Sequence, residues 1–210
     1  QKNAEIEALQ AQINPHFLYN TLDSVNWMLI ARGEMDISAV VVALGKLMQY
    51  SMDTARAMVS LEEEYRNVRD YLMIQKNRLE DRLEFTLELD EPLKCFPVPK
   101  LILQPLVENA IKYGIEPSLQ PGHILVRTRK TDDDIQILVK DNGCGMDEAQ
   151  LTFYRRLLRN DPSGQTNIGV RNVARRLQLH FGGRCGFDVS SRPGDGLSIT
   201  IRIPAQEEQP

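Results

Sequence analysis

The sequence has few cysteines, and none is paired at a metal-binding spacing. Cys95, Cys144 and Cys185 are far apart along the 210 residues, and no CxxC motif is present. An odd number of scattered cysteines argues against a disulfide framework and against a zinc site built from thiolates. We therefore expect free thiols in a reducing compartment.

The sequence also lacks long apolar runs and an excess of charge of one sign. No apolar run approaches the ~20 residues that a membrane-spanning helix needs, and no signal-peptide pattern is present. The net charge is −4 and the basic residues are scattered, so no general attraction to nucleic acid or anionic lipid is expected. The 42% hydrophobic and 26% charged contents are typical of globular domains. Because Gln1 falls inside a helical pattern, we expect the chain to be part of a longer protein.

The first part of the chain has a helical pattern that ends at Gly33. At about 100° per residue, one apolar stripe contains Leu18, Leu22, Val25 and Leu29. The opposite side contains His16, Asn20, Asp23 and Trp27. Pro15 removes an amide donor and is expected to kink the helix. His16 would then be open to a second reactant, although the helical position alone favours an ordinary surface or packing histidine.

Two more helices are expected before residue 80. Asp36 can cap the first, whose apolar face would contain Ile37, Val40, Val41, Leu44, Leu47 and Met48. The segment 60–63 (Ser-Leu-Glu-Glu) is a capping box for the second, with an apolar face of Leu61, Tyr65, Val68 and Leu72. Upstream, Ile6, Leu9 and Ile13 form a seam at alternating spacing, which predicts a homodimer through the first helix.

After about Arg82 the pattern changes to strands that alternate with helices. Strands are expected at 83–89, 124–129, 135–139, 187–191 and 197–203, and helices at 100–113, 151–158 and 168–181. Mostly hairpin-like strands with interleaved helices predict an α+β sandwich, a mixed sheet with helices on one face. We place the domain boundary near residue 80, which gives a helical region 1–80 and an α/β domain 81–207.

The first of three spaced motifs in this second part is Gln104–Gly114. On a helix, Glu108, Asn109 and Lys112 supply an acceptor, an oxygen able to bind a metal and a cation. Phosphate chemistry uses such groups, with an oxygen on Mg²⁺ and a lysine near phosphate. By itself, the motif fits an amphipathic helix with a solvated face.

The second motif, 141–146 (Asp-Asn-Gly-Cys-Gly-Met), directly follows a strand. Its glycines permit close backbone approach to a ligand, and Asp141 can accept a hydrogen bond from an exocyclic amine such as that of adenine. A hairpin turn fits the same residues.

The third motif, 167–173, opens a helix, and the N-terminus of a helix is a suitable site for a phosphate. It follows a polar segment from Asp147 to Asn167 that can act as a lid. A fourth, 194–197, fits a plain hairpin equally well.

Taken together in this order, the motifs resemble those of the LytS/YesM-type sensor histidine kinases over essentially the whole chain. Residues 12–22 resemble the phosphoacceptor box of that family. Residues 104–114, 141–146 and 167–173 resemble the N, G1 and G2 boxes of the ATP-binding fold shared with gyrase, Hsp90 and MutL. The resemblance implies a helical dimerisation and phosphoacceptor region followed by this ATP-binding domain.

The resemblance also assigns roles to residues. His16 would be the phosphorylated histidine, with Asn20 one turn further on the same face to position it or a water molecule. Asn109 would bind Mg²⁺, Lys112 would contact phosphate, and Asp141 would read the adenine amine. Other ATP-site residues implied by the boxes are Glu108, Tyr113, Gly143, Gly145, Met146, Ile168, Gly169 and Val170.

The implied function is ATP-dependent autophosphorylation on His16, followed by transfer to an aspartate of a response regulator receiver domain. The whole protein would be a bacterial membrane sensor, with this chain as its cytoplasmic portion and the membrane anchor in a missing N-terminal part. Two departures stand out: Phe17 replaces the acidic residue that follows the histidine in many histidine kinases, and Asn167 replaces a usual glycine. The alternative is a degenerate nucleotide-binding scaffold that transfers nothing.

Overall fold

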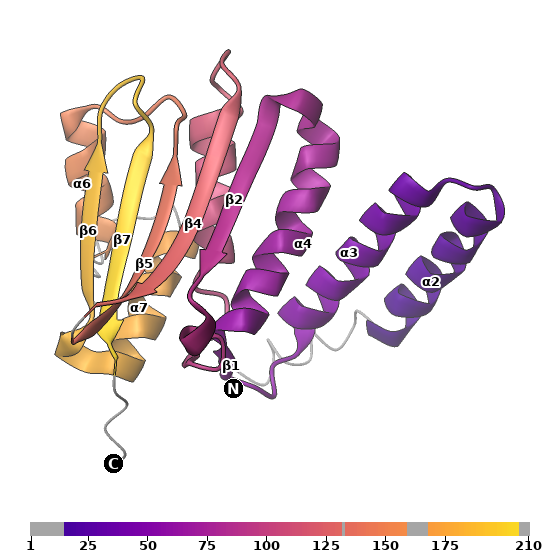
Figure 1. The fold of residues 1–210 in the computed structure, drawn as a ribbon, viewed down its shortest axis with the longest axis horizontal. Coiled ribbons are helices and arrows are strands. Elements are labelled where there is room, and N and C mark those ends of the chain that lie inside the picture. The colour runs from indigo at the N-terminus through magenta and orange to yellow at the C-terminus, as the bar shows by residue number, and fades with distance from the viewer. Residues whose placement is uncertain (1–14, 132, 159–167, 206–210) are drawn as a thin grey trace, which may run out of the picture. The chain divides into compact units, whose positions relative to one another are not determined.

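A computed structural model of the protein describes residues 15–131, 133–158 and 168–205 (Figure 1). The contacts divide the chain into two compact units, residues 1–54 and 55–210, which we describe separately. Three features of the sequence analysis lie outside the described residues. They are the seam at residues 6–13, the segment before Pro15 where a kink is expected, and Asn167. The predicted boundary near residue 80 was placed where the sequence pattern changes from helices to strands, and it stays a prediction.

The first unit contains two packed helices, α2 (Pro15–Ala31) and α3 (Met35–Met52). They are joined by a tight turn in which Gly33 has a φ of 77°, a conformation that glycine adopts without strain. The apolar stripe of α2 is half-buried and the side with His16 and Asn20 is exposed, as the helical wheel predicts.

The predicted apolar face of α3 is only partly correct. Ile37 and Leu44 are exposed, and the buried positions are Ser38, Ala43 and Leu47. Two of these three buried residues have small side chains, and the Ser38 hydroxyl donates to Asn26 Oδ1 of α2 at 2.6 Å. Asp36 does not cap the helix: the N-cap residue is Glu34, and Asp36 lies in the first turn, where a negative charge is still favourable.

The second unit is built on a five-stranded mixed sheet with the order β2-β4-β5-β7-β6 (Figure 1). The strands are β2 (Leu83–Leu89), β4 (Gly122–Lys130), β5 (Asp134–Asp141), β6 (Gly186–Ser191) and β7 (Leu197–Pro204). Only β2 and β4 run parallel; the other pairs are antiparallel. This arrangement confirms the predicted α+β class.

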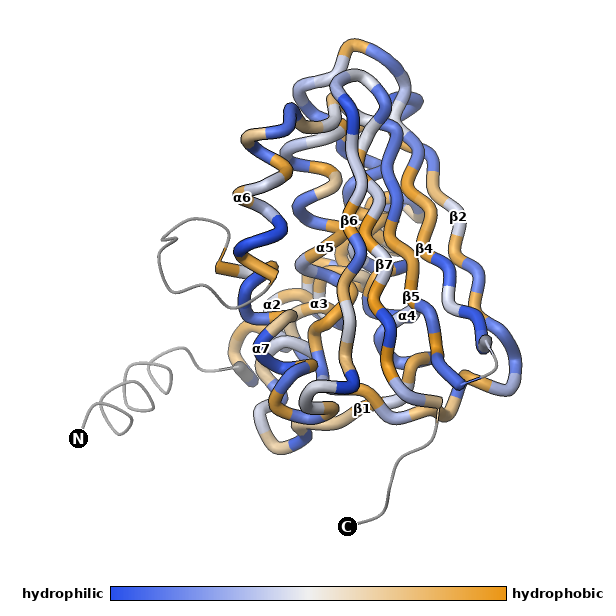
Figure 2. Tube along the Cα trace, turned by 90° about the vertical axis from the view of Figure 1, so that its left-hand side faces the viewer, coloured by the Kyte–Doolittle hydropathy of each residue, from blue (hydrophilic) through white to orange (hydrophobic). Residues whose placement is uncertain are grey.

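The helices of this unit are α4 (Leu61–Leu79), α5 (Gln104–Asn109), α6 (Glu148–Leu158) and α7 (Ile168–Phe181). In Figure 2, α5, α6 and α7 lie on the same side of the sheet. Alternate residues of β4, β5 and β7 are buried on one face, which forms the core against these helices. The predicted capping box of α4 is present, and its four predicted apolar residues are buried.

Two short strands were not predicted. β1 (Met58–Ser60) pairs antiparallel with β3 (Pro97–Pro99), beside the start of α4. Proline has no backbone N–H to donate to a neighbouring strand, so it is tolerated only at the edge of a sheet, as in this two-stranded pair. For the same reason a segment rich in proline is not recognised as a strand from its sequence. Short 3₁₀ turns at Glu80–Arg82, Glu91–Leu93 and Gly182–Arg184 complete the elements.

Candidate functional site

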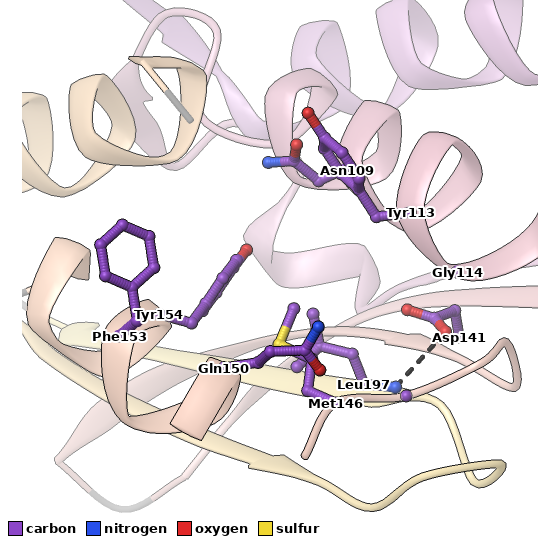
Figure 3. A pocket seen from close by; sticks show the side chains of 10 residues that line it. Asn109, Tyr113, Gly114, Asp141, Met146, Gln150, Phe153, Tyr154 and Leu197 are labelled. Atoms are coloured by element: carbon purple, nitrogen blue, oxygen red, sulfur yellow. Dashed lines mark hydrogen bonds between the residues drawn. The ribbon is translucent and has the colours of Figure 1, made fainter. Parts of the chain in front are cut away.

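The α/β unit contains a cavity of about 250 Å³ at the ends of β5 and α5 (Figure 3). Residues of α5 and the turn after it, of β5 and the loop after it, of α6 and of β7 line it: Asn109, Tyr113, Gly114, Asp141, Gly145, Met146, Gln150, Phe153, Tyr154 and Leu197. The first motif supplies the first three of these residues and the second motif the next three. The tertiary structure therefore brings together two motifs that are about 30 residues apart in the sequence.

Asp141 is the polar end of an otherwise apolar row. It is the last inward-facing residue of β5, after Ile135, Ile137 and Val139, and only 2% of it is exposed. Its Oδ1 accepts hydrogen bonds from the backbone amides of Gly143 (2.8 Å) and Leu197 (3.3 Å). Burial raises the pKa of Asp141, and these two amides act against that shift. With Oδ1 fixed in this way, Oδ2 remains as an acceptor beside the cavity.

The glycines of the second motif are required by the protein's own backbone. A Cβ on Gly143 would lie 2.3 Å from the carbonyl group of Gly114, whose oxygen accepts from the Cys144 amide at 3.0 Å. Gly145 has a φ of 66°, and a Cβ there would lie 1.9 Å from the Arg192 carbonyl oxygen. The sequence predicts close backbone approach, but the partner in both cases is another segment of the chain.

The fourth motif, which fits a plain hairpin, contributes to the site as well as forming the β6–β7 turn. A Cβ on Gly196 would lie 2.0 Å from the Asp141 carbonyl oxygen, so this turn packs directly on the end of β5. The next residue, Leu197, donates its amide to the Asp141 carboxylate and lines the cavity. No sequence signal separated this role from that of an ordinary hairpin.

The helix of the first motif begins later than predicted and changes its winding. Its α-helical part starts at Gln104, and residues Ala110–Ile115 form a π-helical turn directly after Asn109. Such turns are frequent at functional sites because they re-aim side chains. Asn109 and Tyr113 face the cavity from this segment, whereas Glu108 and Lys112 are exposed outside it. The Lys112 Nζ atom lies over the Tyr113 ring, 5.1 Å from the ring centroid. Glu108 accepts a hydrogen bond from Gln104 Nε2 at 2.7 Å.

A buried carboxylate sets the start of this helix. Glu64 of α4 is fully buried and accepts hydrogen bonds from three consecutive backbone amides, those of Leu101 (2.6 Å), Ile102 (2.9 Å) and Leu103 (2.9 Å). Leu101 has a φ of 59°, which is unusual for a leucine. From the other side, Arg176 of α7 donates to the carbonyl oxygens of residues 100 and 101. The loop before α5 is therefore fixed by two helices.

The predicted residues of the third motif lie at the start of α7 and do not line the cavity. Ile168 is 59% exposed, Val170 is buried in the core, and Gly169 packs against Pro105. The residues just before α7 are outside the described part of the chain, so the predicted phosphate contact of this motif stays a prediction.

Gln150, Phe153 and Tyr154 of α6 also line the cavity and were not predicted. They belong to a segment that the sequence indicates only as a polar lid with a short helix. Tyr154 is 2% exposed. Its hydroxyl oxygen is buried, and among the described residues it has no hydrogen-bond partner.

In the helical unit, His16 and Asn20 lie side by side on the exposed face of α2. The Asn20 amide nitrogen is 3.2 Å from His16 Nδ1 and 3.4 Å from Nε2. An amide at this distance can select the ring tautomer or hold a water molecule beside the ring. The helical wheel predicts this contact, because residues four apart on a helix are neighbours.

Within residues 15–131, 133–158 and 168–205, no group of three or more His, Cys, Asp or Glu residues has the geometry of a metal site. Mg²⁺ does not need one, because it is commonly held by one or two protein oxygens together with phosphates and water. The half-buried Asn109 fits such a role by its oxygen and its place in the cavity wall. In the described part of the chain, none of the helices has both the length and the apolar character needed to cross a bilayer.

Comparison with known families agrees with both units. Residues 4–83 match the family model described as histidine kinase. Residues 98–207, more than half of the chain, match the model described as histidine kinase-, DNA gyrase B- and HSP90-like ATPase. The chain belongs to the sensor histidine kinase family. The family predicted from residues 12–22 and the first three motifs of the second part is thereby confirmed.

Individual relatives are consistent with this family. The sensor histidine kinase YesM of Bacillus subtilis is 42% identical over 99% of this chain and 34% of its own length. The sensor protein kinase HptS of Staphylococcus aureus is 28% identical over 97% of this chain and 39% of its own length. This chain thus spans little more than a third of these relatives.

Solved structures of family members share the fold at low sequence identity. The histidine kinase domain of the blue-light activated histidine kinase from Erythrobacter litoralis EL346 has a TM-score of 0.52 at 18% identity, covering 94% of this chain and 92% of that one. The catalytic domain of histidine kinase ThkA has a TM-score of 0.52 at 19% identity, covering 72% of this chain and 97% of that one. These likenesses show the fold.

Proposed function

We propose that this chain is the kinase portion of a two-component sensor. It binds ATP with Mg²⁺ in the cavity of the α/β unit, transfers the γ-phosphoryl group to His16, and passes it to an aspartate of a response regulator receiver domain. The observation that carries the proposal is Asp141: a buried carboxylate, held by two backbone amides at the end of β5, presents a free acceptor to a cavity of this family's ATPase fold.

The cavity suits an adenine nucleotide. The acceptor of Asp141 matches the exocyclic amine of adenine, and Met146 and Leu197 supply apolar surface for the ring. Asn109 is in position to give an oxygen to Mg²⁺, which would supply positive charge to offset the charge of the phosphates. Lys112 is exposed next to Tyr113, and we propose that it turns from the tyrosine ring to a phosphate when nucleotide binds.

In the transfer step, an unprotonated ring nitrogen of His16 forms a bond to the γ-phosphorus as the bond to the β–γ bridging oxygen breaks and ADP leaves. Phosphoryl transfer of this kind depends mainly on alignment and charge neutralisation. Because Phe17 follows His16, the acid found there in many histidine kinases is missing, and we propose that Asn20 positions the His16 ring or a water molecule beside it.

We further propose that the helical unit forms a homodimer and that the whole protein is anchored in the bacterial membrane through a part outside this chain, so that this portion lies in the cytoplasm. The helical unit exposes large apolar side chains, among them Phe17 (65% exposed), Trp27 (69%) and Met35 (61%). Such exposed apolar surface on two packed helices is typical of a surface that a second copy covers.

The deciding experiment incubates the chain with γ-labelled ATP and Mg²⁺, beside the His16→Gln variant. We expect label that is lost in acid and kept in alkali on the parent, and none on the variant. Nucleotide binding without labelling would favour the alternative, a degenerate scaffold, and Asn167→Gly would then be the next variant.

A further inference from the structure

The hydroxyl of Tyr154 has an unusual environment in this cavity. The side chain is 2% exposed, yet its hydroxyl oxygen has no hydrogen-bond partner among the described residues. A buried hydroxyl without a partner is unfavourable, and a phenylalanine would fill the same space without that loss. The neighbouring Phe153 shows that the helix accepts phenylalanine beside the same cavity. The hydroxyl therefore needs an explanation other than packing.

The geometry shows which group the hydroxyl faces. Figure 3 shows Tyr154 reaching from α6 across the cavity, with its oxygen directed towards the wall that carries Asn109. Burial raises the pKa of Tyr154, the charge of Asp141 adds to the shift, and the nearby Asn109 side chain acts against it. The phenol therefore stays neutral at physiological pH and can accept a hydrogen bond from an amide nitrogen.

An asparagine side chain has two ends, and only one of them can bind a cation. If Asn109 Nδ2 donates to the phenol oxygen of Tyr154, Asn109 Oδ1 is turned to the remaining space of the cavity. Without that bond the amide is free to rotate by half a turn, which would present a donor where a cation needs an oxygen. A fixed orientation lowers the cost of binding because the group is already in place.

We propose that Tyr154 is a positioning residue that orients the side chain of Asn109 when a nucleotide and its divalent cation occupy the cavity. The inference rests on the proposed function. It assigns the buried phenol of α6 to the side of the cavity where Asn109 would hold the cation.

The test compares Tyr154→Phe with the parent in two measurements. The first is the melting temperature of the empty protein, which we expect to stay the same or rise because the variant removes an unpartnered buried hydroxyl. The second is ADP affinity by calorimetry, with Mg²⁺ and with EDTA. We expect a roughly three- to tenfold loss with Mg²⁺, the range of one net hydrogen bond, and little change without it.

Tyr65→Phe is the matched control. Tyr65 is also buried, at 4% exposure, but its hydroxyl donates to the Glu88 carbonyl oxygen at 2.9 Å and lies 2.8 Å from Thr128 Oγ1. Its loss should lower the melting temperature by a few degrees and leave ADP affinity unchanged.

Each other outcome has a distinct meaning. A lower melting temperature for empty Tyr154→Phe would overturn the inference, because the hydroxyl would then be structural. Equal ADP affinity of parent and variant would overturn it, and so would an equal loss with and without Mg²⁺, which would indicate direct contact with the nucleotide. If the parent binds no ADP at all, the proposed function fails and the inference falls with it.

A spectroscopic measurement is independent of affinity. The side-chain amide signals of Asn109, assigned by their loss in Asn109→Ser, should shift when Mg²⁺ and ADP are added to the parent. In Tyr154→Phe we expect those signals to stay close to their positions in the empty protein. An identical shift in both proteins would contradict the proposed hydrogen bond.

Discussion

The carboxylate of Asp141 accepts a hydrogen bond from the backbone amide of Leu197, 56 residues later in the chain, at 3.3 Å. This bond joins the end of β5 to the start of β7 and leaves the second carboxylate oxygen for a ligand. The site is therefore built by a hairpin turn as much as by the motif that contains Asp141. The first prediction concerns this carboxylate.

Asp141→Asn should affect stability and binding in opposite directions. The pKa of Asp141 is raised in the folded state, so its charge opposes folding once the pH exceeds that pKa. The variant keeps an oxygen for the two backbone amides but carries no charge. We expect a higher melting temperature than the parent at pH 7, with the difference shrinking as the pH falls and Asp141 becomes protonated.

Nucleotide binding should weaken in the same variant. The asparagine side-chain nitrogen would face the adenine amine, and because both groups are donors no hydrogen bond could form. Loss of a hydrogen bond to a charged group costs about 1.5–3 kcal/mol of binding free energy, which lowers the affinity at least tenfold. Melting curves between pH 4 and pH 8, together with ADP titrations, check both parts. A variant less stable than the parent at pH 7 would contradict the first part, and unchanged ADP affinity the second.

Glu64→Gln should destabilise the α/β unit. The carboxylate accepts three backbone amides at the start of α5, and a glutamine supplies one oxygen while its nitrogen faces a donor. We expect the free energy of unfolding in urea to fall by about 2–4 kcal/mol. ADP affinity should fall too, because α5 carries Asn109. Glu62→Gln, two residues earlier and exposed, is the control and should change stability by less than about 0.5 kcal/mol.

Gly143→Ala should also be destabilising, by roughly 2 kcal/mol or more, because its Cβ would lie 2.3 Å from the Gly114 carbonyl group. Gly183→Ala provides the comparison, since a Cβ there meets nothing within 4 Å. Urea unfolding of both variants measures the difference. Equal stability of the two would show that the approach of the two backbone segments is not tight.

Asn20→Ala should reduce removal of phosphate from the response regulator more than it reduces autophosphorylation. The Asn20 amide is within reach of both ring nitrogens of His16 and can orient a water molecule beside it. We expect about a tenfold loss of phosphatase activity, since the water would lose its alignment. Thr21→Ala, at an exposed neighbouring position, is the control. Equal losses of the two activities, or no loss of either, would reject this division of roles.

Much of the fold follows from the sequence alone, because hydrophobic periodicity sets which face of each element is buried. The alternation at 135–139 predicted the strand, and Asp141 was expected directly after it; the structure extends β5 to include Asp141. Two other predictions are correct for the same reason: that His16 and Asn20 lie side by side on one helix face, and that a capping box begins the helix at Ser60. These are local relationships, and the chain geometry of a helix or strand determines them.

Only the tertiary structure decided which distant segments meet. The hydrogen bonds of the Glu64 carboxylate and of the Leu197 amide carry no periodic signal, because each joins a partner from another part of the chain. The late start of α5 also depends on distant residues: Leu101 has a φ of 59°, which an α-helix does not allow, and Glu64, about 40 residues earlier, holds the amides of this loop. Sequence patterns record local preference, whereas the hydrogen bonds that complete this site depend on packing between elements.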